Sequence, residues 1–288
     1  MPELPEVEAI RTQLEKYLSG HRIEKVEIRN PKIFEGVVKN VEGASFKEFR
    51  RFGKVLSLDL SNDFSLVIHV KMTGQLIYRG PHLKNPQLSK KVSGGLGGSH
   101  THVIFHLDKK GMLYYNDFRR FGWIKVVRTD DVQKTGLVGK MGPEPYYAKA
   151  TQGRPLTIEY FESLLRKTRR NIKVLLMDQA KIGGIGNIYA NDALWLSKID
   201  PKRAANSLAE SEIHELFNAI ETVIKKGMEM GGSSENSYVR PDGTEGEYQN
   251  HTLVYGKTGQ LCSRCKKENI MKFMLGGRGT YFCPKCQK

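Results

Sequence analysis

The sequence predicts an α+β protein of two domains, an N-terminal β-sandwich flanked by helices and a C-terminal helical domain that ends in a four-cysteine module. Three patterns support this prediction. Short β-type runs recur between residues 23 and 128, helical periodicity follows between residues 157 and 230, and all four cysteines lie between positions 262 and 286. A chain of 288 residues is long enough for two domains with conventional cores.

The first half should open with an amphipathic helix from residue 3 to about residue 18. Apolar residues recur there at helical spacing, from Val7 to Leu18, and Gly20 follows as a stop signal. Regular short strands should then build a β-sandwich or a barrel, of which we expect the sandwich. The strands that we expect cover residues 23–29, 44–50, 54–60, 64–72, 101–107, 112–116 and 122–128.

Residues 79–99 interrupt these strands with Gly, Pro, Ser and Lys and show no periodicity, which predicts a mobile loop. In the second half, a capping box formed by Ser207 and Glu210 should open the longest helix and Gly231 with Gly232 should close it. From residue 247 the pattern becomes β-type again. The expected helices cover residues 157–168, 171–179, 187–197 and 207–230. The expected divisions are a catalytic sandwich (1–135), a linker (136–156), a helical DNA-binding domain (157–246) and a zinc finger (247–288).

The composition favours a polyanionic partner. Forty-six Lys and Arg residues against 31 Asp and Glu residues leave a net charge of +15, which suits nucleic acid. A membrane surface is the rival polyanion, but no run approaches the ~20 apolar residues of a spanning helix, and the acidic N-terminus is unlike a signal peptide. We therefore expect a cytoplasmic, nucleoid-associated protein that binds no membrane.

The cysteines form two Cys-x2-Cys pairs. Cys262 and Cys265 are separated from Cys283 and Cys286 by 17 residues, a spacing typical of two zinc knuckles that share one tetrahedral site. Four cysteine ligands saturate the metal, so we expect one structural Zn²⁺ that stabilises the hairpin between the pairs.

Two glycine-rich segments could face an anion. Arg278 lies among glycines in residues 276–282, where a guanidinium could grip a phosphate, although a solvated arginine is the alternative. Residues 181–195 read as helix, turn and helix, with Asn187 opening the second helix and its amides directed towards a phosphate. A simple helical hairpin explains that turn nearly as well.

The first six residues, Met-Pro-Glu-Leu-Pro-Glu, offer a nucleophile beside an acid. Removal of Met1 would expose the secondary amine of Pro2, whose unperturbed pKa lies near ~7.7–8.0, so that much of it is uncharged near neutrality. Such an amine can form an iminium while Glu3 transfers protons. The alternative is that these residues merely start a helix.

A family resemblance joins these motifs. MPELPEVE at the start, MGPEP at 141–145, GIGNIYANDALW at 184–195 and the terminal four-cysteine finger occur in this order. The chain closely resembles formamidopyrimidine-DNA glycosylases (Fpg or MutM) and, more distantly, their endonuclease VIII (Nei) cousins, over essentially all 288 residues. The resemblance implies an enzyme that removes oxidised bases from DNA and cleaves the resulting abasic site.

The resemblance also implies roles for individual residues. Pro2 is expected to be the nucleophile, Glu3 the catalytic acid and Glu6 a supporting carboxylate. Lys54 and Arg278 should bind phosphates around the lesion and so contribute to catalysis. Lys173 and Asn187 match positions of the DNA-facing helix-two-turn-helix.

Three further residues should fill the hole that an extruded base leaves in the duplex, namely Met72, Arg119 and Phe121. Apolar wedges and an arginine can replace the stacking and pairing lost on base extrusion. Met72 is also in phase with the apolar residues of the preceding strand, which on sequence alone favours an ordinary core methionine, and Phe121 shares this ambiguity. We expect His69 and the pair His100 and His102 to be structural hydrogen-bonding residues.

The chain departs from the family pattern at three places. The 79–99 loop is longer and more glycine-rich, His100-Thr101-His102 replaces His-Asp-His, and Asp192 replaces a glutamate and should keep its supporting role. Leu4 points to the Fpg branch, in which residues 233–250 would be a mobile lid over an oxidised purine.

We therefore expect a monomeric bifunctional DNA glycosylase and abasic-site lyase that excises 8-oxoguanine and formamidopyrimidines from damaged double-stranded DNA. Its N-terminal proline would form a Schiff base and drive β,δ-elimination. Two alternatives remain open: a Nei-type enzyme for oxidised pyrimidines, and a non-catalytic, zinc-dependent protein that binds lesions through basic contacts.

Overall fold

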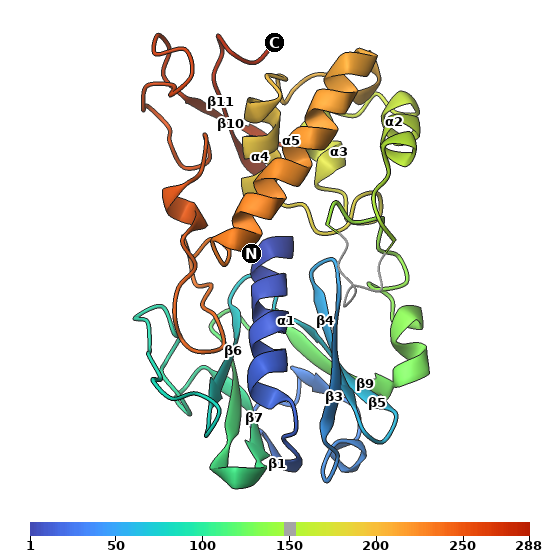
Figure 1. Ribbon diagram of the computed structural model, residues 1–288, viewed down its shortest axis with the longest axis vertical. Helices are drawn as coiled ribbons and strands as arrows, with labels where there is room; N and C mark the ends of the chain where they lie inside the picture. The colour runs from blue at the N-terminus through green and yellow to red at the C-terminus, as the bar shows by residue number, and fades with distance from the viewer. Residues whose placement is uncertain (147–153) are drawn as a thin grey trace. The chain divides into compact units, whose positions relative to one another are not determined.

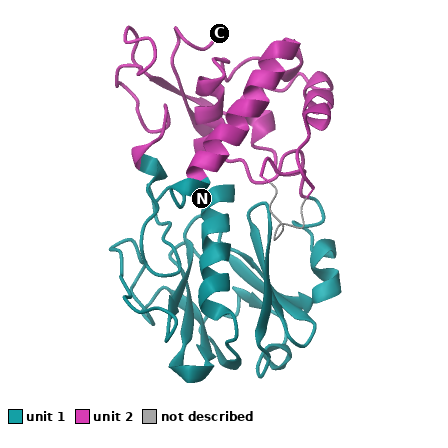
Figure 2. Cartoon of the chain, viewed as in Figure 1, with its two compact units in different colours: residues 1–140, 149–152, 228–249 teal, residues 141–148, 153–227, 250–288 magenta. Residues whose placement is uncertain are grey.

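The computed structural model describes residues 1–146 and 154–288, which form two compact units (Figure 2). The first unit contains residues 1–140 and 228–249, and the second contains residues 141–146, 154–227 and 250–288. The middle of the expected linker, residues 147–153, lies outside the described residues. The units differ from the sequence-based divisions mainly because residues 228–249 return to the first unit.

The first unit combines helix α1 with two β-sheets that share one hydrophobic core (Figure 1). One sheet has the order β2-β9-β5-β4-β3 and the other β1-β7-β8-β6, and only the β2–β9 pair is parallel. The α1 helix packs against the edge strands of both sheets, β3 and β6. The elements are α1 (Leu4–Leu18), β1 (Ile23–Ile28), β2 (Phe34–Glu35), β3 (Phe46–Phe52), β4 (Val55–Leu60), β5 (Phe64–His69), β6 (Gly74–Arg79), β7 (Thr101–Leu107), β8 (Met112–Asp117) and β9 (Trp123–Arg128), with 3-10 turns at Val38–Asn40, Asp108–Lys110 and Thr129–Lys134.

The expected sandwich is confirmed, but two of its strands were not predicted from the sequence. Strand β6 is missing from the expectation because Leu76, Ile77 and Tyr78 are all fully buried, which removes the alternation that reveals a half-exposed strand. Strand β2 has only two residues. Strand β5 ends at His69 rather than at Met72, so the apolar phase of the strand does not continue to the methionine.

The second unit is helical and ends in a β-hairpin. Its elements are α2 (Ile158–Arg166), α3 (Ile172–Leu176), α4 (Asn187–Leu196), α5 (Glu210–Glu229), of which the last two residues belong to the first unit, β10 (Met271–Leu275) and β11 (Arg278–Phe282), with 3-10 turns at Ala205–Ser207 and, in the following segment, Tyr248–Asn250. The β11 strand packs against α4. No helix within the described ranges is long and apolar enough to cross a membrane.

The expected capping box at Ser207 is wrong. Ser207 ends a separate 3-10 turn, where its hydroxyl donates to the Ala204 carbonyl oxygen (2.8 Å). Helix α5 begins at Glu210 instead, and the Glu212 carboxylate accepts the Ala209 N–H (2.8 Å). The helix ends as expected, because Gly231 and Gly232 both adopt positive φ (65° and 82°).

The expected return to β structure at residue 247 is also wrong as far as residue 260. Residues 253–255 form no strand because their N–H groups bind the buried carboxylate of Asp192 on α4, at 3.0, 3.0 and 3.1 Å. The backbone is therefore satisfied by a side chain rather than by a neighbouring strand.

Candidate active site

The N-terminal residues are held in place at the start of α1. Pro2 is buried, and Glu3 and Glu6 are 3% and 1% exposed. The two Glu6 oxygens accept the N–H of Glu3 (2.6 Å) and the N–H of Ser233 (2.7 Å). Glu6 thus connects the start of the chain to the segment that follows α5, within the same unit.

Close packing also explains a glycine next to this contact. A Cβ atom on Gly232 would lie 2.7 Å from Glu6 Cγ, and Gly232 has a φ of +82°. Only glycine combines this approach with this backbone conformation. Because Met1 precedes Pro2, the Pro2 nitrogen lies in a peptide bond until Met1 is removed. Met1 itself is 41% exposed.

Lys54 lies in the turn between β3 and β4, and two contacts join strand β3 to α1. Arg11 Nη1 donates to the Phe49 carbonyl oxygen (3.3 Å). One helical turn closer to the N-terminus, Glu8 accepts from Arg51 Nε (2.8 Å). Strand β3 and α1 therefore run in opposite directions, and Lys54, which follows this strand, is 3% exposed.

His69, at the end of β5, is a neutral imidazole. Burial, and then the positive charges of Lys71 and Lys54, lower its pKa to about 3. Its Nδ1 accepts the Lys71 N–H (3.0 Å). The structural roles expected for His69 and His102 are supported, since His102 Nε2 is 2.8 Å from the Asp117 carbonyl oxygen. His100 makes an edge-on ring contact with Phe118 instead (5.1 Å).

The structure brings Met72, Arg119 and Phe121 together. Arg119 Nη1 lies 3.1 Å from Met72 Sδ, and the Arg119 guanidinium lies 4.7 Å from the centre of the Phe121 ring. Phe121 is 54% exposed, and Met72 is half-buried in the turn after β5. Neither is a core residue, so the core alternative for both is wrong.

One carboxylate that the sequence did not single out organises this cluster. Asp117 is fully buried, and its Oδ1 accepts from Thr73 Oγ1 (2.5 Å) and from the Arg119 N–H (3.2 Å). Its Oδ2 accepts the Gly122 N–H (2.8 Å). Asp117 thereby fixes the turn that carries Met72 and the turn that carries Arg119 against each other.

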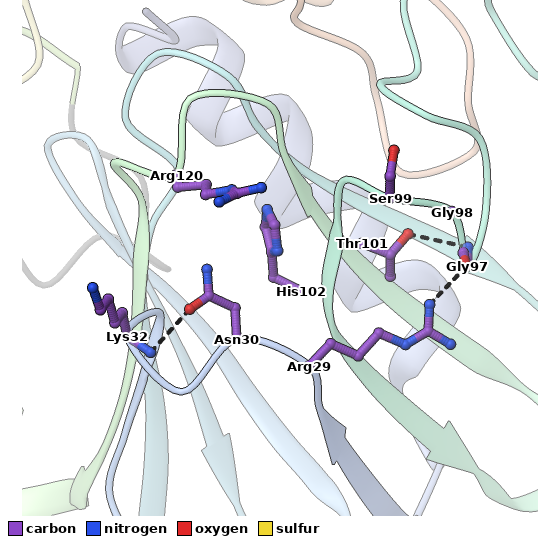
Figure 3. Close-up of a pocket in the computed structure, with 9 residues that line it drawn as sticks. All are labelled: Arg29, Asn30, Lys32, Gly97, Gly98, Ser99, Thr101, His102 and Arg120. Atoms are coloured by element: carbon purple, nitrogen blue, oxygen red, sulfur yellow. Dashed lines mark hydrogen bonds between the residues drawn. The ribbon is translucent and has the colours of Figure 1, made fainter.

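A basic pocket of about 780 Å³ opens nearby on the first unit (Figure 3). The side chains of Arg29, Lys32 and Arg120 surround it, and one wall is the backbone of residues 97–99. Arg29 Nη1 donates to the Gly97 carbonyl oxygen (2.6 Å). Three cations around an open pocket suit a phosphate. The pocket cannot be predicted from the sequence, because its cations come from two distant segments.

In the second unit, two side chains converge on the turn of the hairpin. Lys173 on α3 is 1% exposed, and its Nζ donates to the Gly279 carbonyl oxygen (2.9 Å) and to Thr280 Oγ1 (2.8 Å). Asn187 Nδ2 donates to the same Gly279 carbonyl oxygen (3.1 Å). Both side chains therefore stabilise β11, the strand that begins with Arg278.

The hairpin itself presents Arg278. Gly276 and Gly277 form its two-residue loop with φ of 57° and 72°, as a type I′ turn requires. Arg278 follows as the first residue of β11 and is exposed. The sequence expectation of an arginine at a glycine tip is thus confirmed in position.

The four cysteines, one pair before and one pair after this hairpin in the sequence, lie together. Their sulfur atoms all lie within 4.8 Å of one another, with Cys262 to Cys286 at 3.9 Å and Cys265 to Cys283 at 3.7 Å. Sulfurs bound to a tetrahedral zinc at ~2.3 Å lie about 3.8 Å apart, so the residues fit Zn²⁺. Burial raises the pKa of Cys283 and of Cys286, whereas backbone N–H groups lower the pKa of Cys262 and of Cys265, so the distances between the sulfurs are what support a metal site.

Comparison with known proteins agrees with this architecture. The family model of the formamidopyrimidine-DNA glycosylase N-terminal domain matches residues 1–124, and that of the H2TH domain matches residues 141–239. The formamidopyrimidine-DNA glycosylase of Lactococcus lactis subsp. cremoris is 38% identical over 292 residues, covering 100% of both chains. That of Desulforamulus reducens is 40% identical over 294 residues, covering 100% of this chain and 99% of the relative.

Solved structures with the same fold contain DNA. Lactococcus lactis Fpg in complex with abasic-site DNA has a TM-score of 0.85 and 36% identity, with 99% of each chain covered. The complex of that enzyme with DNA containing N7-benzyl-Fapy-dG has a TM-score of 0.85 and 37% identity, with 100% of each chain covered. The family consists of DNA glycosylases of base excision repair that are typically also abasic-site lyases. This chain, itself a DNA-binding glycosylase of base excision repair, therefore belongs to the formamidopyrimidine-DNA glycosylase family.

Proposed function

We propose that this glycosylase excises oxidised purines, such as 8-oxoguanine and formamidopyrimidines, from duplex DNA and then cleaves the abasic site by β,δ-elimination. The observation that carries the proposal is the anchored N-terminus. Pro2 and Glu3 are buried beside each other, and Glu6 fixes the backbone that links them to α1. A chain terminus is ordinarily poorly ordered, and this one is built for a defined geometry.

The chemistry follows from the two residues at that end. After Met1 is removed, the Pro2 nitrogen attacks C1′ of the extruded nucleotide. The bond from C1′ to the base breaks with its electrons leaving on the base, and the base takes up the proton that the Pro2 amine loses. Glu3 delivers a proton to the ring oxygen O4′, the sugar opens, and an iminium joins C1′ to Pro2. The iminium acidifies C2′, and loss of the C2′ proton expels the 3′ phosphate. Loss of the C4′ proton from the resulting conjugated iminium then expels the 5′ phosphate. Water finally hydrolyses the iminium and restores the free amine.

Reaching C1′ requires that the base leave the stack, which costs a few kcal/mol. We assign Met72, Arg119 and Phe121 to the space that the base vacates. Their support is the exposed Phe121 ring and the Arg119 guanidinium stacked over it. Lys54 would bind a phosphate at the N-terminal end of α1.

Arg278 would bind phosphate from the exposed turn of the zinc hairpin. We assign a structural role to one Zn²⁺ held by the four cysteines, since a metal with four thiolate ligands keeps no position for substrate. Lys173 and Asn187 act through this hairpin in our proposal, because both of their side chains bind Gly279. Asp192 has a supporting role, since it joins α4 to the segment that leads into the finger. The enzyme would act as a monomer on the DNA of the nucleoid.

The test is chemical trapping on a duplex with 8-oxoguanine opposite cytosine. Mass measurement first establishes that the purified protein begins at Pro2. Borohydride should then reduce the iminium to a covalent adduct that maps to the N-terminal peptide. A matched protein with an uncleaved N-terminal extension keeps every DNA contact and should bind the duplex without forming an adduct.

Two outcomes separate the alternatives. Faster release of thymine glycol than of 8-oxoguanine would indicate a Nei-type enzyme. DNA binding that is unaffected by the extension, with no turnover by the Pro2 form on either lesion, would leave only a lesion-binding protein.

A further inference from the structure

The 79–99 loop is bonded to the segment that follows α5, although it contains no helix or strand beyond Arg79. Lys91 Nζ donates to Glu245 Oε2 (2.7 Å) and to the Ser234 carbonyl oxygen. Ser89 Oγ donates to Glu245 Oε1 (2.5 Å). Both oxygens of this one carboxylate are therefore held by the loop.

A buried glutamine forms hydrogen bonds with the same two segments. Gln75, on β6, is 1% exposed, and its Nε2 donates to the Lys91 carbonyl oxygen (2.8 Å) and to the Ser237 carbonyl oxygen (2.5 Å). Its Oε1 accepts the Ser93 N–H (2.9 Å). The hydrogen bonds of the Gln75 amide thus hold the loop and the segment together.

Apolar packing and backbone contacts complete the join. Val92 of the loop packs with Ile77 of β6 and Val239 of the segment. The Ser89 N–H donates to the Gly243 carbonyl oxygen (2.9 Å). A Cβ atom on Gly243 would lie 2.1 Å from the carbonyl oxygen of Gln87, so the backbones touch where only a glycine fits.

The other side of the segment reaches the catalytic elements. The Ser233 N–H binds Glu6 on α1, and Ser237 Oγ donates to the Met72 carbonyl oxygen (3.1 Å). Residues 233–245 are therefore suspended between the proposed catalytic residues on one side and the 79–99 loop on the other. A change in the loop contacts should therefore displace the part of the segment that lies between the loop and the contacts with Glu6 and Met72.

We propose that Lys91, assisted by Ser89 and Gln75, is a positioning residue that fixes residues 233–245 for recognition of the extruded oxidised base. The inference rests on the proposed function, in which an oxidised purine occupies the site before excision. The loop contacts act on the base-dependent step alone, because an abasic nucleotide offers nothing for residues 233–245 to cover.

The experiment compares single-turnover rates on two duplexes, one with 8-oxoguanine opposite cytosine and one with a preformed abasic site. Lys91→Met should slow 8-oxoguanine release about five- to tenfold, as expected for the loss of one partly exposed ion pair and one charge-assisted hydrogen bond, and leave abasic-site cleavage unchanged. Lys90→Met is the matched control, because Lys90 is exposed and adjacent, and it should leave both rates unchanged. Lys91→Arg should stay within about twofold of the parent.

A second variant disturbs the join without touching Lys91. Gly243→Ala pushes the loop away from the segment and should give the same selective loss on 8-oxoguanine. Equal rates for Lys91→Met and Lys90→Met, or equal slowing on both duplexes, would overturn the inference while wild-type excision still supports the proposed function. Wild-type protein that cleaves abasic sites but releases no 8-oxoguanine would instead overturn the proposed substrate.

Discussion

Lys173 gives the sharpest test of how the second unit binds DNA. The family resemblance makes it a DNA-facing residue, yet the side chain is 1% exposed and its ammonium is bonded to Gly279 and Thr280. Each phosphate contact contributes about 0.9 to the slope of log K against log salt concentration. When salt rises from 50 to 200 mM, each phosphate contact lowers the binding constant by a factor of about 3.5. A variant that lacks one contact should therefore lose about 3.5-fold less affinity over this range.

The perturbation is Lys173→Met, made both in the parent protein and in an Arg278→Met background. Arg278→Met alone should lower the slope by about 0.9, because Arg278 is exposed at the hairpin turn. If Lys173 acts only through the hairpin, adding Lys173→Met to that background leaves the slope unchanged. Fluorescence anisotropy with a duplex that carries a tetrahydrofuran abasic analogue measures the slope.

The stability cost can be estimated from the same contacts. Loss of two charge-assisted hydrogen bonds should lower the free energy of unfolding of the second unit by about 3–6 kcal/mol, so zinc-loaded protein is used and its thermal unfolding is recorded first. A further fall of about 0.9 in the slope of the double variant would refute the reasoning, since it would require Lys173 to hold a phosphate itself.

Three more outcomes follow from the described contacts. Asp117→Asn should slow lesion excision about tenfold or more, because a neutral amide weakens the hydrogen bonds that align the turns carrying Met72 and Arg119. A fluorescent base analogue opposite the lesion would show impaired extrusion of the base. Removal of the metal with a strong chelator should unfold residues 262–286 and abolish DNA binding, while circular dichroism shows that the first unit still melts cooperatively. Glu8→Gln should lower the free energy of unfolding by about 3 kcal/mol at pH 7, because it removes the carboxylate that pairs with the buried Arg51 guanidinium. Burial raises the pKa of Glu8, but Arg51 and Arg11 outweigh burial and lower that pKa below its usual 4.5. The stabilisation is therefore present above pH 4.5 and is lost as the pH falls through the pKa of the folded state. Denaturant melts at several pH values should show this loss in the parent and a flatter profile in the variant.

Sequence patterns predicted those features that depend on one segment. Periodicity placed α1 and strand β7, and the spacing of the cysteines predicted a cluster whose sulfurs lie at zinc-binding distances. They failed where distant segments decide the outcome. Strand β6 is buried on both faces and shows no alternation, and Asp192 captures three N–H groups of a segment that otherwise resembles a strand.

The site shows the same division. The resemblance supplied Met72, Arg119 and Phe121, and the structure brings them together. Asp117, which aligns them, could not be found because a buried aspartate next to a strand end is equally suited to an ordinary turn. Its function is visible only when both turns are seen to share its carboxylate.

The N-terminal nucleophile proposed above presents a physical problem that Glu6 solves. The first residues of a chain have few covalent constraints, so a catalytic amine there needs contacts that replace the missing preceding backbone. Glu6 accepts the Glu3 N–H with one oxygen and the Ser233 N–H with the other, and Gly232 allows the approach. The nucleophile and the segment proposed to cover the base are therefore fixed by one carboxylate. Because Glu6 holds Glu3 directly, loss of the Lys91 contacts should displace the part of the segment that is proposed to cover the base and leave the backbone that carries Pro2 in place.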